Sequence, residues 1–239
     1  MKIGETARLH IMTIDLLASL DFYTKLGFQR VNESANHGSP ILISDGMITL
    51  EVERGGAECP SELVYFTTHF NETFTGLERS GVMPEGVRSG ERRFCEPGGM
   101  PVRVKSANTR KMYKPEGKPR SLCGRFYELS IEVEEVDEAV AFWQPLGFEV
   151  EHYASSHATF ATLGDGVIRL GVYKRGSCRH RFKNPSLTYF EPDMGERIAK
   201  LKTRGVVFLE ELPDANGKVE NAIAEAPDGQ YLFLFQYDW

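Results

Sequence analysis

Cysteine is scarce in this chain of 239 residues. The four cysteines stand at positions 59, 95, 123 and 178, and no two of them have the short spacing of a metal-binding pair. A chain of this length does not need a disulfide framework, because it can bury a core of its own. We therefore predict that the thiols are reduced and buried.

Basic clusters and long apolar runs are also missing. The formal net charge is −6, and positive charge is concentrated only between Arg110 and Arg125, so the chain lacks the electrostatic footprint of a nucleic-acid-binding protein. No segment approaches the ~20 apolar residues that cross a bilayer, and the first residues, MKIGETARLHIMTID, contain no apolar signal core. We expect a cytoplasmic protein whose partners include neither nucleic acid nor a membrane.

Familiar catalytic motifs are absent as well. The sequence has no Gly-x-Ser-x-Gly elbow, and Cys95, although next to Glu96, has no identifiable base. Gly98-Gly99 precedes a predicted strand, whereas a phosphate-binding loop precedes a helix. These absences argue against catalysis by an activated serine or cysteine.

A long internal repeat is the strongest feature that is present. Residues 22–28 read FYTKLGF, and residues 142–148 read FWQPLGF, at an offset of 120. At the same offset, Asp45-Gly46 returns as Asp165-Gly166, and His37 returns as His157. Matches spread over most of ~50 residues without a gap indicate a duplicated structural unit.

The first copy of the unit has the pattern βαβββ. Arg8, His10 and Met12 alternate with apolar residues as in a strand. Asp15 can cap the helix that follows, and Gly27 closes it. Three β-rich runs come next, at residues 28–34, 39–45 and 46–54.

The same order recurs three more times along the chain. A weaker copy covers residues 62–105, the strong repeat covers 126–174, and a fourth copy begins at residue 187 and ends in the strand YLFLFQY. Between the second and third copies, residues 108–124 are polar and basic and contain two prolines. This composition is typical of a solvated linker.

Four such modules resemble the vicinal oxygen chelate superfamily, which includes glyoxalases, bleomycin resistance proteins and extradiol dioxygenases. The stretch DLLASLDFYTKLGFQRV is similar to its opening signature, and EAPDGQYLFLFQ is similar to its closing strand, although Ala226 replaces the first aspartate. The resemblance covers almost the whole chain. It implies an α+β, glyoxalase-like fold in which four βαβββ modules pair into two open, cup-shaped mixed sheets.

This pairing implies two domains, at residues 1–107 and 125–239, joined by the linker at 108–124. A four-module chain completes both cups by itself, so we expect a monomer or a weak homodimer. Enzymes of the superfamily hold a divalent metal in the cup with His, Glu or Gln, one on the first strand and one on the last strand of each module.

The alignment places eight residues at these metal positions. The positions of the first cup fall on Arg8, Thr49, Glu62 and Arg103, and those of the second on Glu128, Arg169, Ser186 and Phe233. Guanidinium groups stay protonated and repel a divalent cation. We therefore expect no metal or other cofactor. Two arginines facing Glu62 predict spare donors for an anionic ligand in the first cup, whereas Glu128 and Arg169 are expected to balance each other.

Three histidines bear on the prediction that the cups bind no metal. His10 shares a strand face with Arg8, so a shift of the alignment by two residues makes it a metal ligand together with Glu51 or Glu53. A hydrogen-bonded structural histidine is the simpler interpretation of His10. His37 and His157 lie at turns, where polar side chains commonly satisfy the backbone.

Three functional hypotheses remain open, because the sequence does not decide between binding and catalysis. The first is a metal-free, bleomycin-resistance-like protein that binds a small organic molecule, anionic or aromatic; Phe233, Tyr65 and Tyr189 are expected to offer apolar faces in the cups. The second is a metal-dependent lyase, isomerase or dioxygenase that uses His10 and nearby carboxylates. The third is metal-independent acid–base chemistry, with Glu62 or Glu128 as the base and an arginine stabilising an enolate.

Overall fold

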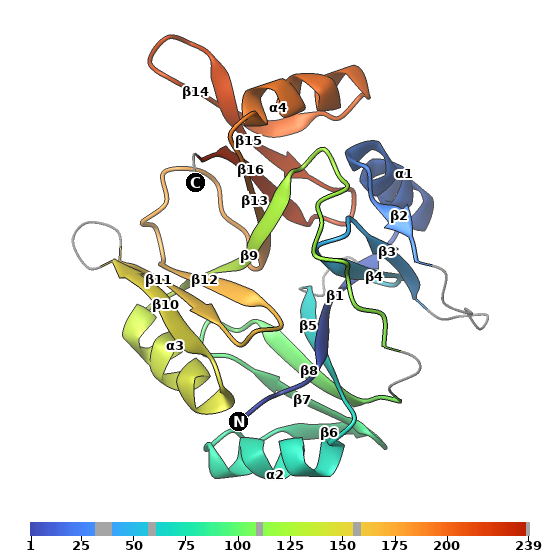
Figure 1. The fold of residues 1–239 in the computed structure, drawn as a ribbon, viewed down its shortest axis with the longest axis vertical. Helices are drawn as coiled ribbons and strands as arrows, with labels where there is room; N and C mark the ends of the chain where they lie inside the picture. The colour runs from blue at the N-terminus through green and yellow to red at the C-terminus, as the bar shows by residue number, and fades with distance from the viewer. Residues whose placement is uncertain (32–39, 57–60, 109–111, 155–158, 238–239) are drawn as a thin grey trace.

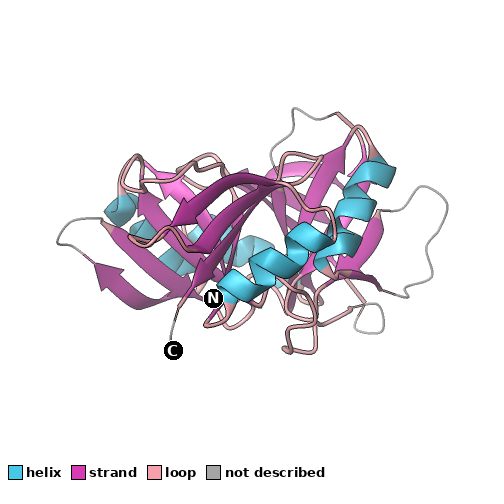
Figure 2. Ribbon diagram, turned by 90° about the horizontal axis from the view of Figure 1, so that it is seen from above, coloured by secondary structure: helices cyan, strands magenta, loops and turns pink. Residues whose placement is uncertain are grey.

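The computed structural model describes residues 1–31, 40–56, 61–108, 112–154 and 159–237. The turn at 36–38 and the repeated histidines at 37 and 157 lie outside these residues. The described part contains two mixed sheets of eight strands each. Figure 1 shows these sheets with their helices, and Figure 2 shows from above that the strands form two neighbouring groups.

The first sheet contains the first two modules. Its strands, in chain order, are β1 (Thr6–Thr13), β2 (Gln29–Arg30), β3 (Ile41–Ser44), β4 (Thr49–Arg54), β5 (Glu62–Thr67), β6 (Glu85–Arg88), β7 (Glu91–Cys95) and β8 (Pro101–Ser106). Across the sheet they lie in the order β2-β3-β4-β1-β5-β8-β7-β6. The first strands of the two modules, β1 and β5, pair antiparallel at the centre, and each pairs in parallel with the last strand of its own module.

The second sheet repeats this arrangement with the third and fourth modules. Its strands are β9 (Arg125–Val133), β10 (Glu149–Ala154), β11 (Phe160–Gly164), β12 (Arg169–Lys174), β13 (Ser186–Glu191), β14 (Phe208–Pro213), β15 (Val219–Glu225) and β16 (Tyr231–Gln236). Their order is β10-β11-β12-β9-β13-β16-β15-β14, which matches the first sheet strand for strand. The predicted α+β, glyoxalase-like fold of four paired βαβββ modules is confirmed.

Each module has one helix, and the helix ends follow the predicted signals. The helices are α1 (Leu16–Leu26), α2 (Phe70–Arg79), α3 (Val136–Trp143) and α4 (Met194–Thr203). The Asp15 carboxylate accepts a hydrogen bond of 3.0 Å from the backbone N–H of Ala18, and Gly27 closes α1 in the left-handed conformation, with φ at 104°. After α3, the residues Gln144–Leu146 form one 3₁₀ turn that contains Pro145 and ends at Gly147. None of these helices is long and apolar enough to cross a membrane.

The core lies between the helices and one face of each sheet. Leu9 and Ile11 on β1, and the equivalent Leu129 and Ile131 on β9, are buried there. Alternation along the strands therefore places the neighbouring residues on the opposite face. We call the face of the first sheet that is turned away from α1 and α2 the first cup face, and the corresponding face of the second sheet the second cup face.

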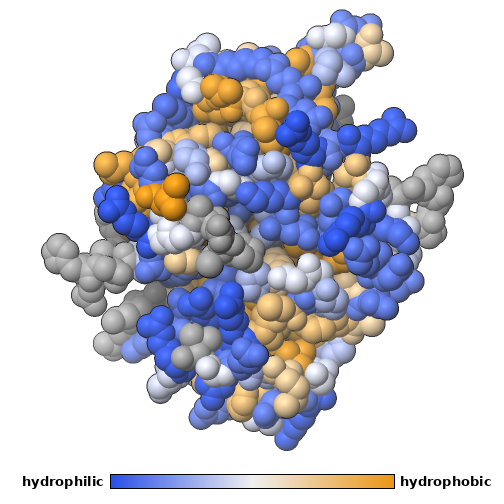
Figure 3. All heavy atoms as spheres, turned by 180° about the vertical axis from the view of Figure 1, so that it is seen from behind, coloured by the Kyte–Doolittle hydropathy of each residue, from blue (hydrophilic) through white to orange (hydrophobic). Residues whose placement is uncertain are grey.

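The two halves pack so that α1 approaches α4 and α2 approaches α3, toward opposite ends of the molecule (Figure 1). The Arg204 guanidinium at the end of α4 donates to the backbone carbonyl of Lys25 at 3.2 Å. The Ser80 hydroxyl after α2 donates to the carbonyl of Pro145 at 3.4 Å. On the side seen in Figure 3, apolar residues form patches with hydrophilic residues between them.

Two predictions about the cysteines and the linker need correction. Cys95, Cys123 and Cys178 are free thiols, but only Cys123 of these is buried. Cys95, at the end of β7, is exposed and Cys178 is half-buried, whereas Cys59 lies outside the described residues. The linker is exposed at residues 116–120, whereas Ser121 and Cys123 are buried. Leu122 donates its backbone N–H to the carbonyl of Leu26 at 2.8 Å, so the end of the linker packs against the first module.

Candidate functional site

The first cup face carries an unusual concentration of charged side chains. His10 on β1 pairs with Glu51 on β4 on one side and with Glu62 on β5 on the other. Side chains two residues along each strand share the same face. The charged residues of this face include Arg8, His10, Glu51, Glu53, Glu62, Glu91, Arg93, Arg103 and Lys105.

Two ion pairs occupy equivalent places in the first and second modules, with their charges exchanged. Arg8 on β1 contacts Glu51 on β4 at 3.0 Å between Nη1 and Oε1, and Glu62 on β5 contacts Arg103 on β8. The equivalence follows from the register, since Leu9 pairs with Leu50 and Leu63 pairs with Val102. The first strand supplies the cation in one module and the anion in the other.

These pairs are largely removed from solvent. Arg8 is 5% exposed, Glu51 4% and Glu62 2%. Burying a charge costs several kcal/mol unless it is paired and hydrogen-bonded. Glu62 is held from a second direction by Arg93, whose Nε lies 2.9 Å from Oε1, and Glu51 has Lys105 at 3.8 Å. The carboxylates of this face therefore stand inside a network of cations.

The expected excess of positive charge is not present on this face. Arg8, Arg93, Arg103 and Lys105 are matched by four carboxylates, namely Glu51, Glu53, Glu62 and Glu91. Glu91 Oε2 lies 3.9 Å from Arg103 Nη1. The sequence analysis placed Thr49 at the last-strand position, but the side chain that reaches Arg8 is that of Glu51, two residues along the same strand.

His10 lies between Glu53 and Glu62, the carboxylate of the second ion pair. Its Nε2 lies 3.0 Å from Glu53 Oε2, and its Nδ1 lies 4.0 Å from Glu62 Oε2. His10 is 8% exposed, whereas the Glu53 side chain is 39% exposed. The imidazole thus contacts one buried carboxylate and one partly exposed carboxylate.

Two buried oxygen atoms on this side of β4 have no hydrogen-bond partner among the described residues. They are Thr49 Oγ1 and Glu51 Oε2. Thr49 is fully buried. Buried polar atoms are nearly always hydrogen-bonded, so these oxygens are ready to bind water or a polar group of a ligand.

An aromatic ring lies beside the network. The Arg8 guanidinium stands over the ring of Phe66 at 4.6 Å from its centroid, and the Lys105 ammonium lies 5.8 Å from the same centroid. A cation over a ring face is stabilised by the ring quadrupole. Sequence reasoning missed Phe66, which the alternation of β5 places on the face of Glu62.

The second cup face has a buried carboxylic acid in place of the ion pairs. Glu128 on β9 is fully buried and accepts hydrogen bonds from the Ser130 hydroxyl at 3.0 Å and the Tyr173 hydroxyl at 2.6 Å. Burial raises the pKa of Glu128 above its ordinary value, against the smaller opposing effect of the hydrogen bonds. A Cβ added to Gly171 would lie 1.9 Å from Glu128 Oε1. The absent side chain at 171 thus makes room for this carboxyl group.

Contrary to the prediction, Arg169 makes no direct ion pair with Glu128 among the described residues, although its positive charge lowers the pKa of that carboxyl group. Its Nε lies 2.6 Å from Glu151 Oε2, and its guanidinium stands over the Tyr127 ring at 4.5 Å. Leu129 pairs with Leu170, so the last-strand residue equivalent to Glu51 is Gly171 and not Arg169. The alignment error is again two residues along the last strand.

Aromatic rings of the chain itself cover Phe233 on the second cup face. Phe233 on β16 is 2% exposed, and its ring centroid lies 5.1 Å from that of Phe182 and 4.7 Å from that of His180. Both rings come from the segment between β12 and β13, residues 175–185. The Ser186 hydroxyl at the end of this segment donates to the Lys183 carbonyl at 2.6 Å. We call residues 175–185 the plug segment.

Tyr65 and Tyr189 do not line the cups as predicted. Tyr65 belongs to the core face of β5, and its hydroxyl donates to Asp165 Oδ2 of the other half at 2.7 Å. Tyr189 takes the matching place on β13, where burial, followed by the nearby Asp45 carboxylate, raises the pKa of the phenol. These tyrosines join the two halves at the repeated Asp-Gly turns.

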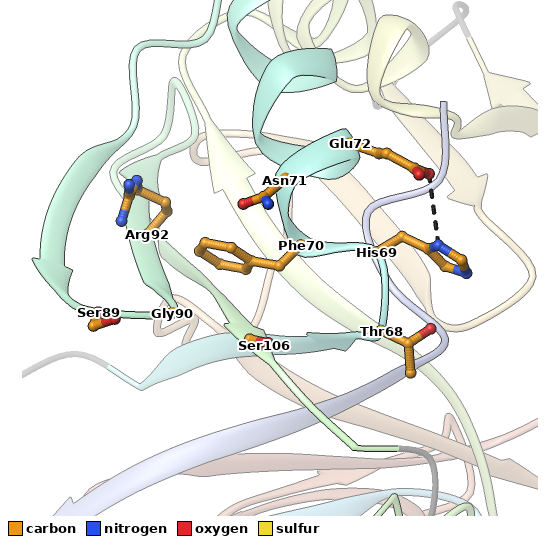
Figure 4. Close-up of a pocket in the computed structure, with 9 residues that line it drawn as sticks. All are labelled: Thr68, His69, Phe70, Asn71, Glu72, Ser89, Gly90, Arg92 and Ser106. Carbon is orange, nitrogen blue, oxygen red and sulfur yellow. Dashed lines mark ion pairs between the residues drawn. The ribbon is translucent and has the colours of Figure 1, made fainter.

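Another hollow, of about 560 Å³, lies at the start of α2 (Figure 4). Its lining includes His69, whose Nδ1 lies 3.6 Å from Glu72 Oε2, and Arg92, whose guanidinium stands 4.7 Å from the Phe74 ring centroid. Among its lining residues, His69 pairs with Glu72, and Arg92 also stands over the ring of Phe70. It is separate from both cup faces.

The residues at the expected metal positions do not fit a divalent cation. On the first cup face these positions hold Arg8, Glu51, Glu62 and Arg103, and on the second they hold Glu128, Gly171, Ser186 and Phe233. Arginine, glycine and phenylalanine side chains donate no electron pair to a metal. Within the described ranges, no three His, Cys, Asp or Glu side chains are grouped to hold an ion.

Comparison of the structure with solved proteins finds the same fold in ring-cleaving enzymes. A catechol 2,3-dioxygenase aligns over 100% of this chain and 94% of its own, with a TM-score of 0.62 and 17% identity. A halotolerant catechol dioxygenase aligns over 99% of this chain and 87% of its own, with a TM-score of 0.62 and 12% identity. The homoprotocatechuate 2,3-dioxygenase of Arthrobacter globiformis aligns over 100% and 81%, with a TM-score of 0.63 and 15% identity.

These neighbours belong to the vicinal oxygen chelate superfamily, and the chain has the fold of that superfamily. No family model and no curated protein matches the sequence. At these identities the likeness establishes the fold, and the chemistry must be argued from the residues of the site.

Proposed function

We propose that this protein binds a small organic molecule on the first cup face, with charged side chains in the place where relatives of this fold hold a metal. The single observation that carries the proposal is the reciprocal pair of buried ion pairs, Arg8 with Glu51 and Glu62 with Arg103. They occupy equivalent positions of the two modules, at the centre of the sheet. Buried ion pairs add little to stability compared with apolar residues, so their presence favours a binding role.

The chemistry of this face favours a ligand with both polar and apolar parts. A carboxylate or carbonyl oxygen of the ligand can replace Glu51 or Glu62 as the partner of a guanidinium, since guanidinium groups bind such oxygens in bidentate fashion. Phe66 offers a ring face beside Arg8. Because the network is balanced in charge, we propose a ligand of small net charge, such as an aromatic acid or a zwitterion.

A metal-dependent enzyme is the second candidate function. The observations in its favour are the ring-cleaving dioxygenases among the structural neighbours and the 3.0 Å contact between His10 and Glu53. The cations around Glu62 and the exposed position of Glu53 speak against it, because a metal site needs three or four converging donors free of competing cations.

Elemental analysis separates the two candidates. The purified full chain would be incubated with Fe²⁺, Mn²⁺ or Zn²⁺, dialysed, and analysed by inductively coupled plasma mass spectrometry. We expect much less than one metal per chain, and the same low content in His10→Ala and in the control His69→Ala, which removes an exposed histidine. One equivalent of metal that is lost in His10→Ala and kept in His69→Ala would overturn the metal-free proposal in favour of the enzyme.

A further inference from the structure

A separate cavity lies where the two halves of the molecule meet. Its volume is about 300 Å³, and its walls come from the start of β1, the linker, and the turns before β4 and β12. The apolar part of the lining is formed by Met47, Ile48, Phe126, Val167 and Ile168. None of the residues that carry the proposed function of the first cup face lines it.

The internal repeat builds two of these walls in the same way. Asp45 Oδ1 accepts hydrogen bonds of 2.8 Å from the backbone N–H groups of residues 47 and 48, and Asp165 Oδ1 does the same for residues 167 and 168. Each aspartate thus fixes the two apolar residues that follow its turn. Two rigid, related apolar walls face the cavity, one from each half.

The polar part of the lining has a net positive charge. Lys2 and Lys114 are exposed, and neither ammonium group has an ion-pair or hydrogen-bond partner among the described residues. The only carboxylate of the lining, Glu5, already accepts hydrogen bonds from the backbone N–H and the hydroxyl of Thr68, at 3.2 and 3.0 Å. The charged groups of the lining therefore sum to +1, because the Glu5 carboxylate offsets only one of the two ammonium groups.

A buried hydroxyl completes the site. Thr6 is 4% exposed and lines the cavity, and its Oγ1 has no hydrogen-bond partner in the described part of the chain. Such a hydroxyl can donate to a ligand oxygen. Ligand sites are typically apolar hollows with a few polar groups, often between domains, and a volume of about 300 Å³ is at the lower end of their range.

We propose that this cavity binds a small monocarboxylate with an aromatic or branched apolar body. The body lies between the walls of residues 47–48 and 167–168, and the carboxylate lies at Lys2 and Lys114, within reach of the Thr6 hydroxyl. The site is independent of the first cup face, so the protein has two places for small molecules.

Isothermal titration calorimetry on the full chain tests the proposal, with sodium 2-naphthoate as the probe and 2-naphthamide as its uncharged match. We expect naphthoate to bind more tightly than naphthamide and its affinity to fall with added salt. Lys2→Gln together with Lys114→Gln should weaken naphthoate about three- to ten-fold, the size expected of partly screened charge contacts. The control Lys200→Gln, an exposed lysine on α4, should leave the affinity unchanged.

Two further variants locate the binding. Val167→Trp fills the cavity and should abolish naphthoate binding, whereas Arg103→Gln on the first cup face should not change it. Absence of naphthoate binding, equal affinity for naphthoate and naphthamide, full affinity in the double lysine variant, or loss of binding in Arg103→Gln would each overturn the proposal. The lysine variants alter exposed side chains, so the test stands even if Val167→Trp fails to fold.

Discussion

At the scale of single residues, burial of carboxylic acids is the dominant electrostatic feature of this protein. The pKa values of Asp45, Glu96, Glu128 and Asp228 are all raised, in each case chiefly because the group is removed from water. Glu128 differs from the other three because it lies on a cup face. Its hydrogen bonds come from hydroxyl groups, which can serve either protonation state.

Glu128→Gln is expected to stabilise the protein at neutral pH. The folded-state pKa of Glu128 is raised above its unfolded value, so its favourable contribution is complete below the unfolded pKa and is lost as the pH rises through the folded pKa. A neutral amide removes this loss, and we expect a gain of about 1 kcal/mol in the free energy of unfolding. Chemical denaturation checks this when it is measured from about pH 4, near the ordinary pKa of a glutamate, up to about pH 8.

The free energy of unfolding of Glu128→Gln should also depend less on pH than that of the natural chain. Glu138→Gln makes the same chemical change at an exposed position of α3 and should reproduce the natural profile. A Glu128→Gln protein that is less stable than the natural chain at neutral pH would show that the carboxylate is stabilised in its charged form.

The ion pairs of the first cup face should reveal their coupling in a double-mutant cycle. Arg8→Met leaves the buried Glu51 without its nearest cation and is expected to lower the free energy of unfolding by about 3 kcal/mol. Adding Glu51→Leu removes the stranded charge and should recover most of this loss. Urea denaturation of the two single variants and the double variant measures the coupling, and additive effects would contradict the close ion pair.

At the scale of secondary-structure elements, the plug segment makes the two halves of the molecule different. The strands of the two sheets correspond one to one, yet only the second cup face has Phe182 and His180 packed on Phe233. The equivalent connection in the first half, between β4 and β5, is shorter, and its residues 57–60 lie outside the described part of the chain. The choice of the first cup face for the ligand therefore rests on its two ion pairs.

Removing the two rings of the plug segment should expose the second cup face. In His180→Ala with Phe182→Ala, we expect the environment-sensitive dye 8-anilino-1-naphthalenesulfonate to bind with enhanced fluorescence, because Phe233 and Phe235 lose their cover. The control Tyr153→Ala removes an exposed aromatic residue and should not increase dye binding. An unchanged signal in the double variant would mean that the segment does not shield an apolar surface.

The sequence predicted the elements well because local signals determine them. Asp15 and Gly27 predicted the ends of α1, and the repeat at an offset of 120 residues predicted that the two halves are equivalent. The face of the sheet on which a side chain lies, and its exact position along the strand, were harder to predict. Both depend on the register between strands that are distant in the sequence. Thr49 was chosen where Glu51 makes the contact, and Arg169 where Gly171 stands, because strand alternation repeats every two residues and does not distinguish these neighbours.

Other features of the site depend on contacts that no local pattern carries. Tyr65 was assigned to a cup although it reaches across to Asp165 of the other half. The polar composition of residues 175–181 gave no sign that this segment covers a sheet. A signal that could have identified one missed residue was the glycine at position 171, in the middle of a predicted strand, since a glycine there often marks the close approach of another group.

At the scale of the whole molecule, reciprocal contacts hold the two halves together. Tyr65 bonds to Asp165, and Tyr189 lies close enough to Asp45 for the carboxylate to raise its pKa. The Tyr23 hydroxyl of α1 donates to Asp228 Oδ1 in the fourth module at 3.2 Å. These buried polar contacts fix how the halves sit, and with them the cavity that both halves line.

A crystal structure of the full chain grown with Mn²⁺, with anomalous scattering data collected for manganese, tests the central claim most directly. The account predicts that the first cup face will show the guanidinium groups of Arg8 and Arg103 on their glutamates, and density of water or an organic molecule beside Thr49. An anomalous peak within bonding distance of His10 Nε2 and of the Glu53 or Glu62 carboxylate would contradict it.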